Sequence, residues 1–384
     1  MGNLFKPKYI PINMVPKNVH AWEIKGYAII KKQLRDDIRK GLKEKYGSLN
    51  KAEIALNISD YYHRKLHETF TRKDILFRLI KESKTGRHES EKYITKWKDT
   101  IPQESYKINF PVKPNILHTR IISHLIGDGT IGSNYTWCQK DVAPLEILIR
   151  KLLGKNLRRR NQVVTIPRII IKIMVQALDL KLDNLTKEEL CEKIAYLPKN
   201  HKIQLLTAII EDEGTCDINR IRIRMNNERI MNVIKQVIDS LNYSRSNLTK
   251  RWYKKDGVKK DLWDISLNVK GIKKYWKDLK KIEDIYGKSL GLWKKREKVK
   301  KLSKQKANID GWIRNKSLRR KILKSGRFKN VSFDSIKREF LLTDNETMSI
   351  LRYMVNKKDL KKIKQGVYKK NEIAEANLPL LSIL

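Results

Sequence analysis

The sequence predicts an α+β protein whose core is a duplicated αββαββα unit, with a helical region before it and a winged helix after it. Three observations favour this fold. The order helix, strands, helix, strands, helix occurs twice between about residues 110 and 300. Each copy begins with an apolar helix that ends in an acidic residue followed by glycine. The chain beyond residue 330 reads helix, turn, helix, strands. We therefore expect three domains, at 1–108, at 109–300 with halves of about 110–197 and 198–300, and at 301–384.

Composition restricts the partners. The chain has 384 residues, with 85 Lys and Arg against 42 Asp and Glu, a formal net charge of +43. Because unpaired basic side chains are almost never buried, this charge lies on surfaces and attracts polyanions, nucleic acid first of all. No run of about 18 apolar residues would span a membrane, and no apolar secretory segment begins the sequence. The three cysteines, Cys138, Cys191 and Cys216, are too few for a disulfide framework. We expect an intracellular protein of the cytoplasm, nucleoid or an organelle matrix.

The N-terminal region is expected to be helical, with a long helix from Ala28 to Lys45. Residues 47–66 are similar to a helix-turn-helix with its turn at 57–59, and a plain helical pair is the alternative. The expected packing face of its first helix consists of Ala52, Ile54 and Ala55. His63 and His67 are four residues apart and could hold a metal. With no third ligand evident, we expect both to face solvent.

The first copy in the middle region begins with an apolar helix at 116–129, which ends in glycine. Strand-like segments at 134–139 and 162–166 flank a helix at 144–153 that has proline in its first turn. Pro167 then opens a further helix. This copy therefore alternates helices and strands.

The second copy follows the same order. Its expected elements are a helix at 201–214, a strand at 220–225, a helix at 227–241, a hairpin at 251–269 and a helix at 271–282. The strand alternates polar and apolar residues with period two, which is typical of a half-exposed strand. The pair Asp256–Gly257 predicts the turn of the hairpin.

Both apolar helices end in a carboxylate. Asp128 and Glu213 lie 85 residues apart, so helices packed side by side would bring the two acids together. The small residues available for such packing are Ser123, Thr207 and Ala208. A helix C-terminus carries partial negative charge, and a second carboxylate raises the cost of ionising both acids. A divalent cation such as Mg²⁺ or Mn²⁺ would stabilise the pair, with the backbone carbonyls of Gly127 and Asp212 as further ligands.

These two segments resemble the LAGLIDADG homing endonuclease family. LTAIIEDEG at 206–214 matches the nine-residue motif closely, and IISHLIGDG at 121–129 resembles its GDG variant. The lead-in AYLPKNHKIQ also fits the family. The resemblance covers about 110–300 and departs at Ile122 and His124, where smaller or apolar residues are usual. Two motifs in one chain imply the single-chain, pseudo-symmetric form, which acts as a monomer.

The resemblance implies a site-specific endonuclease of the homing type that hydrolyses phosphodiesters of double-stranded DNA with Mg²⁺ (or Mn²⁺). Asp128 and Glu213 would be the catalytic acids, one for each strand, and would bind the metal together with Gly127 and Asp212. Two alternatives stay open. One is a transcription regulator on the same scaffold that does not cleave DNA. The other is a maturase that binds intron RNA and assists its splicing.

Polar and basic residues of the predicted strands are candidates for contacting DNA. The alternation at 220–225 predicts a free basic face that fits the major groove, whereas a merely solvated face is the alternative. Family members also place a basic residue near each scissile phosphate, and Lys294 and Lys295 are the candidates here. The other candidates are Arg220, Arg222, Arg224, Asn226, Asn227, Gln139, Arg158, Arg159, Arg160, Lys250, Arg251, Lys254, Lys255, Lys259 and Lys260. Arginine would read guanine, the amides adenine, and most of the rest would hold phosphates.

The C-terminal region at 331–370 resembles a winged helix whose wing turns at Gln365–Gly366. The residues expected beneath its two helices are Phe333, Ile336, Phe340, Met348, Leu351, Tyr353 and Val355. From 291 to 384 the chain carries 26 Lys and Arg against 9 Asp and Glu, as a module that grips phosphates should. Arg352 and Lys364 are its candidate DNA contacts, and a small basic dimerisation domain is the alternative.

Overall fold

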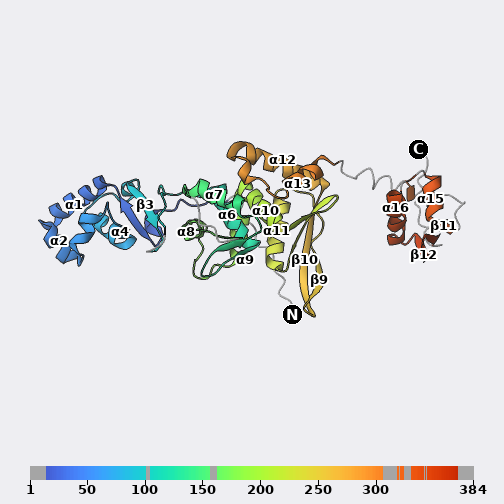
Figure 1. Cartoon of the computed structure of the whole chain (residues 1–384), viewed down its shortest axis with the longest axis horizontal. Helices are drawn as coiled ribbons and strands as arrows, with labels where there is room; N and C mark the ends of the chain where they lie inside the picture. The colour runs from blue at the N-terminus through green and yellow to red at the C-terminus, as the bar shows by residue number, and fades with distance from the viewer. Residues whose placement is uncertain are drawn as a thin grey trace. The chain divides into compact units, whose positions relative to one another are not determined.

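The computed structural model describes residues 14–100, 104–155, 162–305, 318–319, 321–323, 330–340, 342 and 344–370. Helices and antiparallel strands are both present, so the predicted α+β class is confirmed (Figure 1). The chain divides into two compact units, Met1–Gln305 and Lys306–Leu384. None of the described helices combines the length and the apolar composition that crossing a lipid bilayer requires.

The N-terminal part of the first unit is a small sheet with helices. Its elements are η1 (Ala21–Glu23), β1 (Tyr27–Ile30), α1 (Lys32–Tyr46), α2 (Leu49–Leu56), α3 (Asp60–Lys65), β2 (Thr71–Arg72), α4 (Lys73–Glu82), α5 (Arg87–Glu91) and β3 (Ile94–Lys98). The strands pair antiparallel in the order β2-β1-β3. The predicted start of the first helix is wrong: Ala28 lies in β1, because this segment buries alternate side chains and pairs with β3. Helix α1 begins later, at Lys32, and ends before Gly47, whose φ is +79°.

The predicted helical pair at 47–66 is present as α2 and α3, and its turn at 57–59 is confirmed. Its packing face differs from the prediction. Ala52 and Leu56 are buried one turn apart, whereas Ile54 is 82% exposed and Ala55 is exposed. Side chains four residues apart share a helix face, so the neighbours of Ala52 turn away from the core.

The prediction that His63 faces solvent is also wrong. Its side chain is 2% exposed, and its Nε2 lies 2.5 Å from Oε1 of Glu53 in α2. His67 lies just beyond the end of α3 and is partly exposed. The two histidines therefore do not form the solvent-facing pair that their spacing suggested.

The first half of the middle region contains every helix and strand predicted for it. Its elements are α6 (Ile116–Ile126), β4 (Gly129–Thr130), β5 (Thr136–Cys138), α7 (Ala143–Leu153), β6 (Val163–Thr165), α8 (Arg168–Ala177) and α9 (Lys187–Ala195). The strands form an antiparallel sheet in the order β4-β5-β6. Helix α9 was not predicted, although Thr186 and Glu189 form a capping box at its start.

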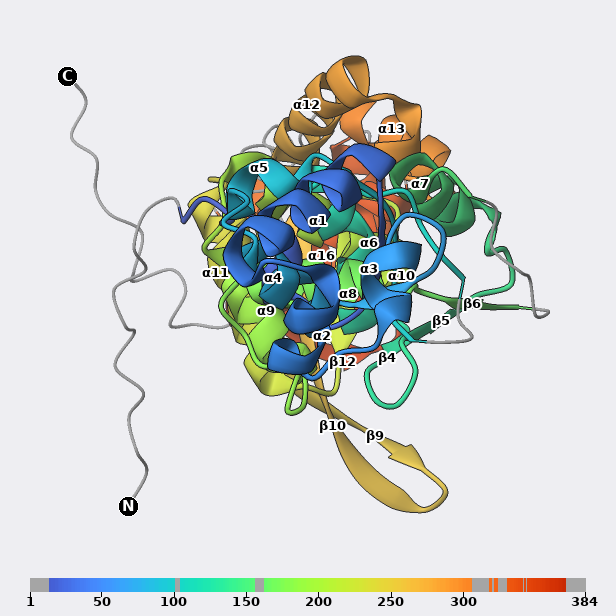
Figure 2. The same ribbon diagram turned by 90° about the vertical axis from the view of Figure 1, so that its left-hand side faces the viewer.

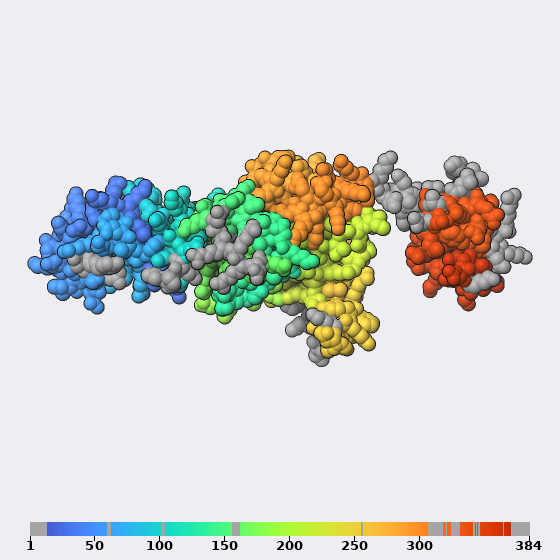
Figure 3. Space-filling model, in the orientation of Figure 1, coloured from blue at the N-terminus to red at the C-terminus, as the bar shows by residue number. Residues whose placement is uncertain are grey.

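The second half is larger, and its predicted elements are confirmed. They are α10 (Lys199–Glu213), β7 (Gly214–Cys216), β8 (Arg220–Met225), α11 (Glu228–Ser240), β9 (Thr249–Lys255), β10 (Val258–Asn268), α12 (Val269–Tyr286), η2 (Lys288–Leu290) and α13 (Arg296–Lys304). The sheet order is β7-β8-β10-β9. The β9–β10 hairpin turns at Asp256 and Gly257, whose φ angles of +52° and +77° suit a tight hairpin turn. This hairpin projects from the body of the unit (Figures 2 and 3).

Helices α6 and α10 pack directly against each other and position the candidate site (Figure 1). The hydroxyl of Thr119 on α6 lies 2.7 Å from Nδ1 of His201 on α10, which joins the starts of the helices. At the other end the backbone of Gly127 approaches Asp212 so closely that a Cβ at position 127 would collide with the carboxylate. Ser123, Thr207 and Ala208, the predicted small residues, are fully buried.

The second unit has its own core. Its elements are β11 (Asn330–Ser332), α15 (Phe333–Glu339), α16 (Asp344–Asn356), β12 (Leu360–Lys364) and β13 (Val367–Lys370), with the sheet order β11-β13-β12. The predicted hairpin turn is confirmed, because Gly366 between β12 and β13 has a φ of +74°. The core beneath α16 is formed by Ile350, Leu351 and Met354, whereas Met348, predicted to be buried, is 37% exposed.

Candidate functional site

The candidate site lies where α6 and α10 end side by side. Asp128 follows Gly127, which ends α6, and Glu213 is the last residue of α10. Gly129 and Gly214 occupy equivalent positions, since a Cβ at either would collide with the preceding helical turn, at Leu125 or at Ile210. Each helix thus leads into its strand through a glycine that packs against the preceding helical turn, and each presents one acid there.

Asp128 and Glu213 influence each other electrostatically. Burial raises the pKa of Glu213 to about 7, with further contributions from the charges of Asp128 and Asp212. Burial also raises the pKa of Asp128, and Asp212 contributes in the same direction. The charges of these carboxylates therefore act on one another at the ends of the two helices, and we call Asp128, Asp212 and Glu213 the carboxylate cluster.

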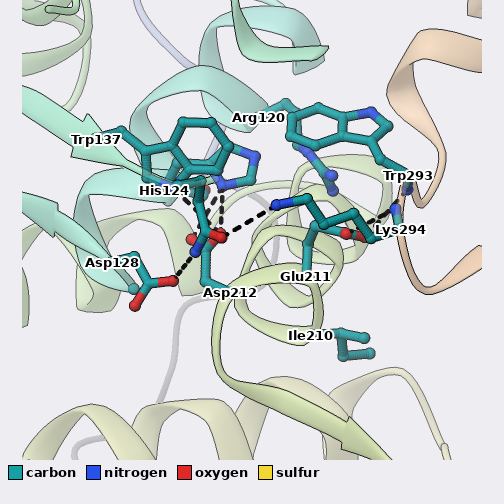
Figure 4. A network of polar contacts seen from close by, with 12 residues as sticks. Arg120, His124, Asp128, Trp137, Ile210, Glu211, Asp212, Trp293 and Lys294 are labelled. Carbon is teal, nitrogen blue, oxygen red and sulfur yellow. Dashed lines mark hydrogen bonds and ion pairs between the residues drawn. The ribbon is translucent and has the colours of Figure 1, made fainter. Parts of the chain in front are cut away.

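Asp212 differs from its two neighbours in the cluster. Its side chain is fully buried and accepts hydrogen bonds from Nδ1 of His124 at 3.0 Å and from Nε1 of Trp137 at 3.2 Å (Figure 4). Burial lowers the pKa of His124, although the negative charge of Asp212 acts in the opposite direction. The imidazole therefore donates its N–H to Asp212 as a neutral ring. The sequence suggested only a backbone role for Asp212. The structure shows that its side chain connects α10 to α6 and β5.

Glu211, which precedes Asp212 on α10, is also buried. Its two oxygens accept the backbone N–H groups of Trp293 at 3.1 Å and Lys294 at 2.9 Å. The indole of Trp293 stacks on His124 at 5.0 Å, and the guanidinium of the fully buried Arg120 lies 4.7 Å from the same indole (Figure 4). These contacts fix the segment before α13 across the ends of both helices.

Two lysines lie at the helix ends. Nζ of Lys187, at the start of α9, donates to the carbonyl of Gly127 at 2.9 Å. Nζ of Lys295 donates to the carbonyls of Ile210 at 2.8 Å and Glu211 at 2.6 Å. Burial lowers the pKa of each lysine, against the nearby carboxylates. Each helix C-terminus, with its partial negative charge, is therefore capped by one lysine.

Sequence reasoning proposed Lys295 but missed Lys187. No local pattern marks Lys187, because only the packing of α9 brings it to the end of α6. Its ammonium group donates a hydrogen bond to the carbonyl of Gly127. This carbonyl is also a predicted metal ligand, so a metal would have to bind it beside the lysine. Lys294 lies at the same site, with its Nζ 3.2 Å from Oε1 of Gln139. The amide of Gln139 donates to Asp128, so this residue lies beside the acid rather than on a separate base-reading face.

The predicted alternation of β8 is confirmed, since Ile221, Ile223 and Met225 are buried. The prediction that its basic face is free is wrong. Two acids pair with the three arginines: Arg220 and Arg222 contact Asp217 at 3.0 and 2.6 Å, and Arg224 contacts Asp264 at 3.2 Å. Asp217 follows β7 and Asp264 lies opposite on β10, a cross-strand relation that sequence alone did not reveal.

The hairpin residues are more open. Lys254, Lys259 and Lys260 are exposed and form no ion pair with the residues that the structure describes, although Lys259 lies 4.8 Å from the Trp252 ring. Lys250 pairs with Asp261 at 2.7 Å, and Arg251 is 3.6 Å from Asp264. The remaining candidates lie as follows: Asn226 donates to the hydroxyl of Tyr253, Asn227 caps α11 and donates to Glu188, and Arg352 is exposed on α16. Arg158, Arg159 and Arg160 and the side chains of Lys255 and Lys364 lie outside the described residues.

Comparisons with known proteins give only distant similarities. No family model and no curated protein match the chain. Among solved structures, mesophilic variants of the homing endonuclease I-DmoI match with 14% identity over 42% of this chain and 96% of that chain, with a TM-score of 0.28. I-DmoI in complex with DNA and Mn matches with 14% identity over 45% and 98%, with a TM-score of 0.27. Full-length DUF199/WhiA from Thermatoga maritima matches with 9% identity over 63% and 90%, with a TM-score of 0.30. Similarity this slight assigns the chain to neither a family nor an activity.

Proposed function

We propose that this chain is a metal-dependent endonuclease that hydrolyses phosphodiester bonds of double-stranded DNA on the pseudo-symmetric, two-motif scaffold of the LAGLIDADG homing endonucleases. One observation carries the proposal. Asp128 and Glu213, one from the end of each paired helix, belong to a single carboxylate cluster that two lysines flank. Neither acid has a lysine or arginine ion-pair partner among the described residues, so the cluster retains negative charge.

The donor set fits a divalent cation with a preference for oxygen. Burial and mutual repulsion raise the pKa values of Asp128 and Glu213, and a cation between them would reverse that effect. Carboxylate and carbonyl oxygens are the ligands that Mg²⁺ and Mn²⁺ select. Asp128 and Glu213 would hold the ion, with the backbone carbonyls of Gly127 and Asp212 as further candidates. A bound ion would polarise the scissile phosphate and activate the attacking water.

The protein groups around the acids have distinct tasks in this proposal. Gln139 orients the carboxylate of Asp128 through its amide. Lys187 and Lys295 are already held at the helix ends, so their ammonium groups would stabilise charge that develops on the phosphate. Asp212 and Glu211 act as positioning residues, because their buried hydrogen bonds keep the helix ends and the Trp293–Lys295 segment in place.

The DNA-binding surface would be the sheet β7-β8-β10-β9 with its projecting hairpin. The exposed lysines of the hairpin suit phosphates, and a twisted antiparallel ribbon fits the major groove. We assign further DNA contacts to the regions at 1–108 and 301–384, the second as a winged helix. The order of β11, α15, α16, β12 and β13 in the second unit suits that fold. Extra modules would raise affinity through effective concentration.

The proposal is tested with a randomised duplex library. The protein selects its bound sequences, and these duplexes are then incubated with protein and Mg²⁺ or with a chelator. We expect metal-dependent cuts in both strands. Asp128→Asn and Glu213→Gln should abolish double-strand cleavage while binding persists. Glu192→Gln, which removes an acid of α9 that pairs with Arg229, should cleave normally.

Two outcomes would contradict the proposal. If both acid variants cut at the wild-type rate, the catalytic assignment is wrong. If a tightly bound duplex is never cut, the chain is a non-cleaving regulator instead. Preferential binding of structured intron RNA over every duplex would favour the maturase.

A further inference from the structure

A second group of potential metal ligands lies in the N-terminal part of the first unit. His20 immediately precedes η1, and His88 and Glu91 lie on α5. One ligand atom from each of the three residues lies within 4.8 Å of the other two. The residues come from segments about 70 positions apart in the chain, so the fold and not local sequence brings them together.

Glu91 is the anchor of this group. Its side chain is 1% exposed, and its Oε1 accepts the backbone N–H of Ala21 at 2.6 Å while its Oε2 lies 2.8 Å from Nδ1 of His20. Among the described residues no lysine or arginine forms an ion pair with Glu91. A buried carboxylate without a cationic partner is costly, because its desolvation is offset only by hydrogen bonds. His20 would offset this cost only as a protonated ring, and a metal ion bound between the carboxylate and a neutral ring would offset it as well.

His88 completes the group from the solvent side. It is exposed, and its contacts with described residues are ring contacts with His20 at 5.1 Å and with Trp22 at 4.8 Å. The indole of Trp22 stacks on His20 at 4.3 Å and closes the other side of the group. One imidazole is thus held rigidly beside the carboxylate while the other is free to adjust, and an ion can enter past His88.

We propose that His20, His88 and Glu91 form a binding site for a Zn²⁺-class transition metal ion. Two imidazoles and one carboxylate suit Zn²⁺, which also takes a water as its fourth ligand. Ligand atoms around a tetrahedral Zn²⁺ lie about 3.3 Å apart, given bonds of about 2.0–2.1 Å. Here the three ligand atoms lie within 4.8 Å of one another, so an adjustment of the exposed His88 would bring them to that spacing. Mg²⁺ is disfavoured, because it selects oxygen ligands. The bond from Ala21 to Glu91 supplies the outer-shell support that orients a metal-binding carboxylate.

The ion would join the segment around η1 to α5. Because the ligands come together only in the folded chain, binding would stabilise this region in proportion to the free ion concentration. The site is independent of the proposed nuclease centre, whose donors are oxygens and which requires none of these three residues.

The test uses the full chain after removal of metals with a chelator. Zn²⁺ is titrated by calorimetry into the wild type, into His88→Ala and into the matched control His67→Ala, which removes a partly exposed imidazole of the same region outside the group. We expect His88→Ala to bind Zn²⁺ at least about tenfold more weakly and His67→Ala to bind like the wild type. Because His88 is exposed, its replacement should not impair folding.

Two further measurements keep the proposal falsifiable. Co²⁺ should give the visible absorption of a tetrahedral nitrogen–oxygen site in the wild type and not in His88→Ala. Glu91→Gln, which preserves the shape of the side chain and an acceptor for the N–H of Ala21 but removes the negative charge, should lose the absorption as well. Equal Zn²⁺ affinity in the wild type and His88→Ala, or a Co²⁺ spectrum that survives both substitutions, would overturn the proposal.

Discussion

The ends of α6 and α10 each lead through a glycine into a strand, but their chemistry differs. Helix α6 ends in Gly127–Asp128, with a single carboxylate that Gln139 holds. Helix α10 ends in three consecutive acids, Glu211, Asp212 and Glu213. The sequence presents these three as equivalent, yet Glu211 binds backbone N–H groups, Asp212 binds His124 and Trp137, and Glu213 is left half-buried beside Asp128.

This difference shows that the role of an acidic side chain depends on its burial and on its hydrogen-bond partners. A carboxylate that accepts two or three hydrogen bonds from buried donors has a structural role, because it satisfies those donors. A carboxylate whose pKa is raised by burial and by other carboxylates is poised to bind a cation. By this criterion Glu213 is the counterpart of Asp128, as the position in the motif suggested, and its two neighbours are structural supports.

Glu211→Ala gives the largest stability change that we expect, and it sharpens this comparison. The substitution leaves the part-buried N–H groups of Trp293 and Lys294 without their acceptor. A fully buried unsatisfied group costs about 1–3 kcal/mol, and partial burial reduces that cost, so we expect a loss of about 2–4 kcal/mol. Glu213→Gln should leave the free energy of unfolding unchanged or slightly raised. Denaturant unfolding of both variants measures the difference, and equal destabilisation would erase the distinction between the two acids.

The lysines test whether the two helix ends are functionally equivalent. Lys187→Met and Lys295→Met each remove a cation beside the acids, and we expect each to slow cleavage by about 10²-fold. Single-turnover rates on the selected duplex measure this effect, with Lys193→Met on the same helix as Lys187 as the control. If only one lysine matters, the two ends do not share a mechanism.

The sequence predicted the helices α6 and α10, the strand β8 and the β9–β10 hairpin, because each has a strong local pattern. It also predicted that Asp128 and Glu213 occupy equivalent positions. It did not predict Lys187, the pairing of Arg222 and Arg224 with acids from other strands, or the hydrogen bonds of Asp212. These depend on contacts between segments distant in the chain. The misplaced start of α1 has a similar origin, since pairing with β3 makes Ala28 part of a strand.

The pH dependence of stability tests the raised pKa of Glu213. Its pKa is about 7 in the folded chain against an ordinary 4.5, so between these values the folded protein binds more protons than the unfolded one. Without metal, stability should therefore fall as pH rises from about 4.5 to 7, by about 1–2 kcal/mol after solvent screening. Thermal unfolding at a series of pH values checks this, and Glu213→Gln should flatten the curve. A profile that is identical in wild type and variant would contradict the assigned environment.

The proposed DNA-binding surface shows a similar contrast between basic side chains that are paired with acids and basic side chains that are not. Lys254, Lys259 and Lys260 lack acidic partners among the described residues, whereas the β8 arginines are paired with Asp217 and Asp264. Replacing Lys254, Lys259 and Lys260 with alanine should reduce the slope of log affinity against log salt by about 0.9 for each phosphate that a lysine no longer neutralises. Replacing Arg220 and Arg222 should reduce it less. Binding titrations at several salt concentrations decide between these surfaces, and a larger effect from the arginines would reverse our ranking.

The most direct test of the central claim is the binding of Mn²⁺ in the presence of the selected duplex. Calorimetry compares the wild type with the double variant Asp128→Asn/Glu213→Gln and with Glu192→Gln. We predict that the double variant loses at least about tenfold in Mn²⁺ affinity while the control is unchanged. Equal Mn²⁺ affinity in all three proteins would show that these two carboxylates do not hold the ion.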